Sequence, residues 1–198
     1  KIFRYSNTAD IATIDPDKTN SVADATVSYH IYDGLYRNVQ GELQPATAES
    51  YEVSDDGLVY TFKLRQDTKW SDGQTVTAKD YEYGMKRLCD PAAACPASYL
   101  GAVLKNGAKV SEGELPVDEL GVKALDDFTL EITLENPADY FVSMTSMSAF
   151  MPVREDLVEK YGNEFGGSAD KQVYNGPFVV SEYSNGKVEL TKNPDYYD

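Results

Sequence analysis

Carboxylates are the most numerous side chains in this sequence that could do chemistry. The chain has 33 Asp and Glu residues, and two carboxylates flanking a sugar bond can act as general acid and base in a glycosidase. Almost all of them stand in turns such as Asp55-Asp56-Gly57, or at helix starts such as Thr77 to Asp80. In those positions short polar side chains form local hydrogen bonds with the backbone. A glycosidase-type enzyme is therefore the less favoured hypothesis.

Other catalytic residue types are scarce. The single histidine, His30, has no serine, cysteine or carboxylate paired with it by a known catalytic motif, and a lone helical histidine is usually structural. The sequence contains no phosphate-binding loop, dinucleotide fingerprint, His-Glu-x-x-His or Gly-x-Ser-x-Gly segment. We therefore expect a protein that is not an enzyme, with no catalytic residue, metal or cofactor.

Two cysteines, Cys89 and Cys95, bracket the segment Asp-Pro-Ala-Ala-Ala after an expected helix. In an oxidising compartment this spacing allows a disulfide that closes a small loop. The alternative is two unrelated thiols. With one histidine in the chain and none near these cysteines, a zinc site is close to excluded.

Aromatic residues make up 12% of the chain, and 15 of them are tyrosines. A tyrosine side chain has an apolar ring and a polar tip, which suits recognition of a ligand that is partly apolar and partly polar. About two-thirds of the tyrosines are explained by sheet faces and strand ends. The remainder are candidates for ligand contact.

The formal net charge of −15 bears on possible partners. Such a chain repels the phosphates of a nucleic acid and an anionic membrane surface, so neither is an expected partner. The composition, 41% hydrophobic and 26% charged, is that of a globular protein. The chain begins in a strand-like segment, and we expect any targeting segment to have been removed.

Hydrophobic alternation predicts the sheet. Tyr60, Phe62 and Leu64 alternate with polar residues, and the same pattern recurs at 128–134, so two hairpins are expected to be neighbours in one antiparallel sheet. Further strands are expected at 2–5, 36–40, 178–183 and 187–192, with a turn at 185–186. Helices are expected at 22–35, 78–88, 97–104, 137–150 and 155–161, and a loop at 105–116.

Several motifs in a fixed order carry a resemblance that covers essentially the whole chain. The sequence resembles the oligopeptide-binding proteins of ATP-binding-cassette importers, the family-5 extracellular solute-binding proteins. The motifs are Ile-Asp-Pro at 14–16, Tyr-Asp-Gly-Leu at 32–35, Pro-Ala-Thr-Ala-Glu-Ser at 45–50, the Ser-Asp-Asp-Gly hairpin at 54–65, Lys-Trp-Ser-Asp-Gly at 69–73, Val-Thr-Ala-Lys-Asp at 76–80, Gly-Val-Lys-Ala-Leu-Asp-Asp at 121–127, Asn-Gly-Pro-Phe at 175–178 and Lys-Asn-Pro-Asp-Tyr-Tyr-Asp at 192–198.

The resemblance implies a mixed α/β (α+β) chain with the type II fold of periplasmic binding proteins. It places lobe one at 1–32 and 155–198, discontinuous and incomplete, and an inserted lobe two at 33–154. Members of the family are usually more than twice as long and have a third lobe. The chain is therefore expected to be an N-terminal fragment that lacks that lobe.

The resemblance also implies a function. The chain would be the substrate-binding component of a peptide importer, a monomer that captures extended peptides and delivers them to a membrane permease. Its location would be extracytoplasmic, in the periplasm or, as a lipoprotein, on the outer face of the cell membrane. A same-family receptor for an oligosaccharide or a metal chelate is the alternative, because a fold does not fix its ligand.

The implied binding residues are few. The first-lobe segment that meets the peptide main chain corresponds to Asn20, Ser21 and Val22, and strand addition of this kind tolerates many side chains. Tyr99 is the counterpart of a ligand-facing tyrosine, although this chain is one residue shorter there. The family's charged residues for the peptide termini belong to the third lobe. The cysteine pair departs from the family's pattern.

Overall fold

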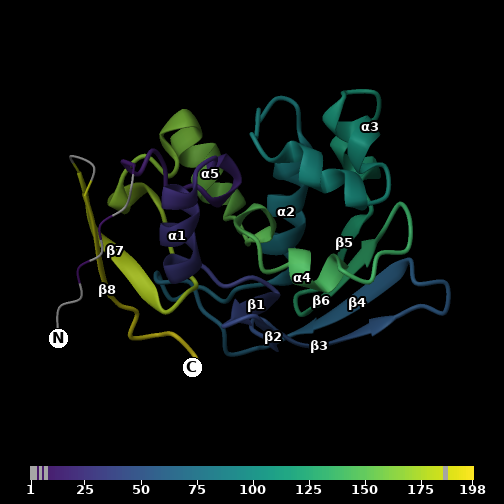
Figure 1. Cartoon of the computed structure of the whole chain (residues 1–198), viewed down its shortest axis with the longest axis horizontal. Coiled ribbons are helices and arrows are strands. Elements are labelled where there is room, and N and C mark those ends of the chain that lie inside the picture. Colours follow the sequence, from purple (N-terminus) through teal and green to yellow (C-terminus); the bar gives the residue numbers. More distant parts are fainter. Residues whose placement is uncertain (1–3, 5, 7–8, 185–186) are drawn as a thin grey trace.

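The largest sheet has four antiparallel strands in the order β3-β4-β6-β5. The computed structural model describes residues 4, 6, 9–184 and 187–198. In it, β4 (Val59–Leu64) lies between β3 (Ala48–Val53) and β6 (Thr129–Thr133), and β5 (Val122–Asp126) follows β6. The two expected hairpins therefore lie in one sheet, as the sequence predicted (Figure 1).

The alternating residues of β4 form the centre of the core. Phe62 is fully buried and lies opposite Leu130 of β6, and Tyr60 lies opposite Ile132. The ring of Phe141 meets that of Tyr60 edge-on, with the ring centres 5.1 Å apart. Burial of such rings dominates the energetics of a core.

Helix α2 (Ala78–Cys89) packs on β5 and β6. It begins where the sequence predicted, because the carboxylate of Asp80 accepts hydrogen bonds from the backbone N–H of Thr77 at 2.8 Å and from the indole N–H of Trp70 at 3.3 Å. This return from the first turn to the N-cap backbone is half of a capping box. The residues of α2 that face the sheet are fully buried: Tyr81, Met85 and Leu88.

The other elements are short, and Figure 1 shows α1 and α5 on the side of the molecule that carries β7 and β8. The α-helices are α1 (Val22–Ile31), α3 (Gly107–Ser111), α4 (Phe141–Met144) and α5 (Glu155–Tyr161). The strands are β1 (Tyr36–Val39), β2 (Glu42–Pro45), β7 (Phe178–Ser184) and β8 (Lys187–Lys192). The 3-10 helices are η1 (Pro16–Lys18), η2 (Ser98–Val103), η3 (Val117–Glu119), η4 (Ser148–Phe150), η5 (Gly162–Glu164) and η6 (Ala169–Lys171).

Asp33 and Asn175 join two segments that are far apart in the sequence. The backbone N–H of Asp33 donates to the side-chain oxygen of Asn175 at 3.1 Å, and the Asn175 amide donates back to the Asp33 carbonyl at 3.0 Å. The next residue, Gly176, lies so close that a Cβ there would be 2.6 Å from the backbone of Ile31 and Tyr32. Only glycine fits where these segments cross.

Four expectations about local structure differ from the structure, three of them about helices and one about a loop. The helix expected at 22–35 ends at Ile31, because Tyr32 adopts extended backbone angles on the way to the crossing. The stretch 137–150 is not one helix but the separate turns α4 and η4, and the loop expected at 105–116 contains α3. The segment expected to be helical at 97–104 forms the 3-10 helix η2.

Two further expectations fall wholly or mainly outside the residues that the structure describes. The strand expected at 2–5 falls mainly on such residues, and so does the turn at 185–186. Within the described ranges, none of the helices is both long enough and apolar enough to cross a membrane.

The core predicts the effect of truncating Phe62. We expect Phe62→Ala to lower the free energy of unfolding by about 3–5 kcal/mol, because it removes a fully buried ring and leaves a cavity. The matched control is Leu125→Ala, since Leu125 is half exposed and should lose less than about 1 kcal/mol. Urea unfolding followed by tryptophan fluorescence measures both; equal losses would contradict a core centred on β4.

Candidate ligand-binding site

Asn20 and Ser21 lead into α1, and Val22 is its first residue. Ser21 has strand-like backbone angles, and its hydroxyl caps the helix by accepting a hydrogen bond from the Asp24 N–H at 3.1 Å. The Val22 side chain is 84% exposed. The first N–H groups of a helix have no partner within it. The Ser21 hydroxyl caps the N–H of Asp24, and Val22 stands at the solvent-exposed start of the helix.

Tyr99 lies on η2, and 73% of its surface is exposed. It lines a shallow hollow of about 330 Å³ together with Tyr140, Met144 and the Pro137 region. We call this feature the aromatic hollow. Tyr140, which the sequence did not single out, is 63% exposed.

No hydrogen bond or ion pair among the described residues joins 20–22 directly to Tyr99. The link is the segment 140–150. At one end the hydroxyl of Ser148 lies 2.9 Å from that of Thr19, next to Asn20. At the other end Tyr140 and Met144 line the aromatic hollow with Tyr99.

A buried ion cluster fixes the chain immediately before Asn20. The guanidinium of Arg87, in the last turn of α2, donates to both carboxylate oxygens of Asp15 at 2.9 and 2.6 Å and to Asp17 at 2.7 Å. It also lies over the ring of Phe165, 5.4 Å from its centre. Arg87 was not predicted from the sequence, because the residues around a helical arginine carry no signal for an ion pair with a carboxylate about seventy residues away.

The same cluster contains a buried carboxylate whose hydrogen bonds are incomplete. Asp17 is fully buried, and its Oδ1 has no hydrogen-bond partner. Burial raises the pKa of the Asp17 carboxyl to about 7, and the charge of Arg87 opposes that rise. The effect of desolvation on this pKa is larger than the opposing effect of a guanidinium that is shared with Asp15.

Lys18 connects this cluster to the loop that precedes Tyr99. Its ammonium donates to the backbone carbonyls of Ala93 and Ala94. The chain that carries 20–22 and the loop that leads to η2 are therefore held together by one short helix, η1.

Of the two alternatives left open for the cysteines, the structure has separate thiols. Cys89 and Cys95 are both free and buried. The sulfur of Cys95 approaches the carbonyl of Arg87 at 3.5 Å, whereas that of Cys89 packs against Gly101. Burial raises the pKa of the Cys89 and Cys95 thiols to about 11 and about 12, which keeps them protonated and unreactive.

His30 has surroundings that fit a structural residue. It is exposed, and its Nδ1 lies 2.6 Å from the Thr26 carbonyl one turn earlier. Within the described part of the chain, no group of three or more His, Cys, Asp or Glu side chains is placed to hold a metal ion.

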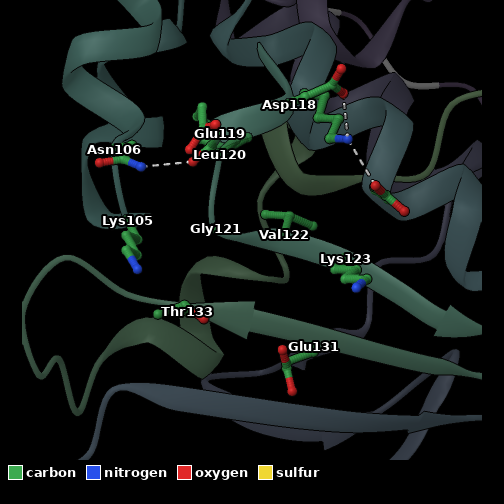
Figure 2. Close-up of a pocket in the computed structure, with 12 residues that line it drawn as sticks. Lys105, Asn106, Asp118, Glu119, Leu120, Gly121, Val122, Lys123, Glu131 and Thr133 are labelled. Carbon is green, nitrogen blue, oxygen red and sulfur yellow. Dashed lines mark hydrogen bonds and ion pairs between the residues drawn. The ribbon is translucent and has the colours of Figure 1, made fainter. Parts of the chain in front are cut away.

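A second hollow, of about 420 Å³, is polar (Figure 2). It lies between α2, the loop at Lys105 and the β5–β6 hairpin, and both signs of charge line it. The ammonium of Lys86 bridges Glu82 at 2.9 Å and Asp118 at 3.0 Å, and Glu82 also accepts from the Ala124 N–H. These pairs fasten α2 to its neighbours, so we interpret this hollow as a structural brace.

Comparison with known proteins adds the family. Residues 42–198 match the family model described as bacterial extracellular solute-binding proteins, family 5 Middle. The chain belongs to this family. The resemblance seen in the sequence is thereby confirmed.

This family-5 chain is similar in sequence to curated proteins and in fold to solved structures. It is 40% identical to the probable deoxycholate-binding periplasmic protein YgiS of Escherichia coli, over 100% of this chain and 38% of that protein. It superposes with a TM-score of 0.95 on the substrate-binding domain of an oligopeptide ABC transporter from Bacillus anthracis, at 39% identity and with 98% of this chain and 38% of that one covered.

A structure of Listeria monocytogenes OppA bound to peptide gives a TM-score of 0.94 at 38% identity, covering 97% of this chain and 38% of that chain. The mixed α/β fold of periplasmic binding proteins is therefore confirmed. The chain spans less than two-fifths of the length of these relatives.

Arg87 yields a first prediction for the site. We expect Arg87→Met to lower the free energy of unfolding by about 3–5 kcal/mol, because Asp15 and Asp17 would remain buried without their cation. The control is Lys171→Met, which breaks the solvent-exposed pair with Glu164 and should have little effect. Urea unfolding of both variants at neutral pH is the measurement; a small loss for Arg87→Met would contradict the role of the cluster.

Asp17 yields a prediction about pH. Its pKa is about 7 in the folded chain and about 3.9 when unfolded, so the folded chain binds this proton more tightly. The contribution of Asp17 to stability therefore falls as the pH rises from about 4 to about 7. We expect Asp17→Asn to remove this fall from the unfolding free energy measured between these pH values.

A carboxylate whose pKa is lowered rather than raised supplies the control. The guanidinium of Arg154 lowers the pKa of Asp156, so the contribution of Asp156 is present at neutral pH and is lost as the pH falls. Asp156→Asn should therefore flatten the acid side of the profile. If Asp17→Asn leaves a profile parallel to that of the unchanged chain, the raised pKa is wrong.

Proposed function

We propose that this chain is part of the substrate-binding component of an ATP-binding-cassette importer, and that its ligand is a peptide. The observation that carries the proposal is the solvent-exposed start of α1 at 20–22, where Ser21 has extended backbone angles, in a fold shared with an OppA described as bound to peptide. A binding protein of this kind has no catalytic step, so we infer no enzymatic activity.

The geometry indicates how a peptide would be held. An extended peptide can add to the backbone of 20–22 as a further strand, with main-chain hydrogen bonds providing affinity and hydrated pockets tolerating varied side chains. The Val22 N–H is one donor for such a bond. Tyr99 offers a ring against which a peptide side chain can pack.

The wider assignments belong to the same proposal. Residues 1–32 and 155–198 would form lobe one and residues 33–154 lobe two, meeting at the crossing of Asp33 and Asn175. The complete receptor would act as a monomer outside the cytoplasm, in the periplasm or attached by a lipid, and would deliver ligand to a membrane permease.

A steroid acid is the second candidate ligand. It is favoured by the relative whose name describes probable deoxycholate binding and which is 40% identical to this chain. Titrating deoxycholate beside a mixture of two- to five-residue peptides separates the two candidates.

A proline at position 22 tests the main-chain contact. We expect Val22→Pro in the full-length receptor to weaken peptide binding by about three- to tenfold, because it removes one hydrogen-bond donor. Proline is tolerated at the first position of a helix, and the preceding Ser21 already has the extended angles that proline requires. Isothermal titration with the peptides measures the change.

The control is Val22→Ala, which shortens the side chain but keeps the N–H. It should bind peptides as the unchanged receptor does. Equal affinities for the proline and alanine variants would argue against a main-chain contact at residue 22. Absence of peptide binding by the unchanged full-length receptor would overturn the peptide assignment.

A further inference from the structure

The aromatic hollow has two walls that are fixed relative to each other. One wall is η2, which carries Tyr99, and the other is the segment from Glu135 to Met144. The backbone N–H of Glu135 donates to the Val103 carbonyl at 2.9 Å, which ties the walls together. A preformed site of this kind loses little conformational freedom when a ligand enters.

Its two tyrosines have no aromatic partners. Most other rings near the sheet are paired, such as Tyr60 with Phe141, but neither Tyr99 nor Tyr140 stacks on another ring within the described residues. Both are more than three-fifths exposed. The Tyr140 carbonyl is held by the hydroxyl of Ser143 at 2.7 Å, so this residue sits on an ordered turn.

The lining of the hollow carries negative charge only. Glu135 is its only charged lining residue, and the described lining contains no lysine or arginine. The Oε2 atom of Glu135 accepts a hydrogen bond from the Asn106 N–H at 2.9 Å, which restricts the position of the carboxylate. Asp139, also exposed, precedes Tyr140 in the chain. The hollow therefore complements a cation rather than an anion.

We propose that the aromatic hollow is a subsite for a basic side chain, lysine or arginine, of the bound peptide. The ammonium or guanidinium lies against the faces of Tyr99 and Tyr140 and is balanced by the Glu135 carboxylate. Its aliphatic stem packs on Met144 and Val103. Cations are attracted to tyrosine faces within about 6 Å, and long basic side chains bury their stems on apolar surface.

This inference rests on the proposed function, since the side chain belongs to a peptide held at 20–22. It adds a preference to a binding mode that is otherwise tolerant of side chains. The preference arises from Tyr140 and Glu135 together with Tyr99.

The test compares matched peptides on the full-length receptor. One set of alanine pentapeptides carries a single lysine at each position in turn, and the second set carries norleucine, which is neutral and similar in length. We expect lysine at one position to bind about three- to tenfold more tightly than norleucine there, measured by isothermal titration. Tyr140→Leu, Tyr99→Leu and Glu135→Gln should each reduce this ratio by about two- to fivefold.

Three control variants separate the subsite from general effects. Tyr140→Phe keeps an aromatic face and should keep the ratio. Tyr161→Leu and Glu159→Gln remove a ring and a charge on α5, away from the lining of the hollow, and should also leave the ratio unchanged. Circular dichroism melting confirms that each variant is folded, which the exposure of Tyr99 and Tyr140 leads us to expect.

The outcomes are distinct. Equal binding of lysine and norleucine peptides at every position, or an unchanged ratio in Tyr140→Leu, would overturn the subsite while leaving the peptide receptor intact. An equal loss of ratio in Glu159→Gln would show attraction by net charge alone and would also overturn it. Binding of no peptide by the unchanged receptor would be a failure of the proposed function itself.

Discussion

The ion pairs of the Arg87 guanidinium with Asp15 and Asp17 fix the arrangement of the chain that leads to the proposed binding segment, 20–22. Arg87 is carried by α2, which is held in turn by its apolar face on the sheet. The planar fork of arginine can satisfy both oxygens of one carboxylate, which a lysine ammonium cannot do. Arg87 thus links the core to the surface: α2 is held by the core, and its arginine holds the segment that leads to 20–22.

The crossing around Asp33 is the second constraint, and it explains three of the motifs that mark the family. The Asp33 carbonyl accepts from the hydroxyl of Tyr81 at 2.9 Å, and its carboxylate accepts from the hydroxyls of Tyr196 and Tyr197. Burial raises the pKa of the Asp33 carboxyl, and those hydroxyls oppose the rise. The motifs at 32–35, 175–178 and 192–198 therefore close the fold, while the proposed ligand contacts lie elsewhere.

Glycines in this chain serve two different purposes, a backbone turn with positive φ or a close approach between two backbone segments. At Gly57 and Gly73 the positive φ angle confirms the turns that Asp-Gly pairs predicted. At Gly107, however, glycine is present because a Cβ would lie 1.8 Å from the Gly101 carbonyl, and the residue begins α3 rather than a loop. A glycine in sequence shows that the backbone is special but does not show whether a turn or a close approach requires it.

The sequence alone determined the four-stranded sheet, the start of α2 and the family. Alternation and helix caps are local signals, read over a few residues, and the family motifs are conspicuous because they contain turn residues. Only the tertiary structure decided the partners of Arg87, the separation of the two thiols and the placing of Tyr140 opposite Tyr99. The contacts of Arg87 and the hollow shared by Tyr99 and Tyr140 join residues tens of positions apart, which no local periodicity records. The two thiols are close in sequence, but each sulfur packs against a different part of the fold.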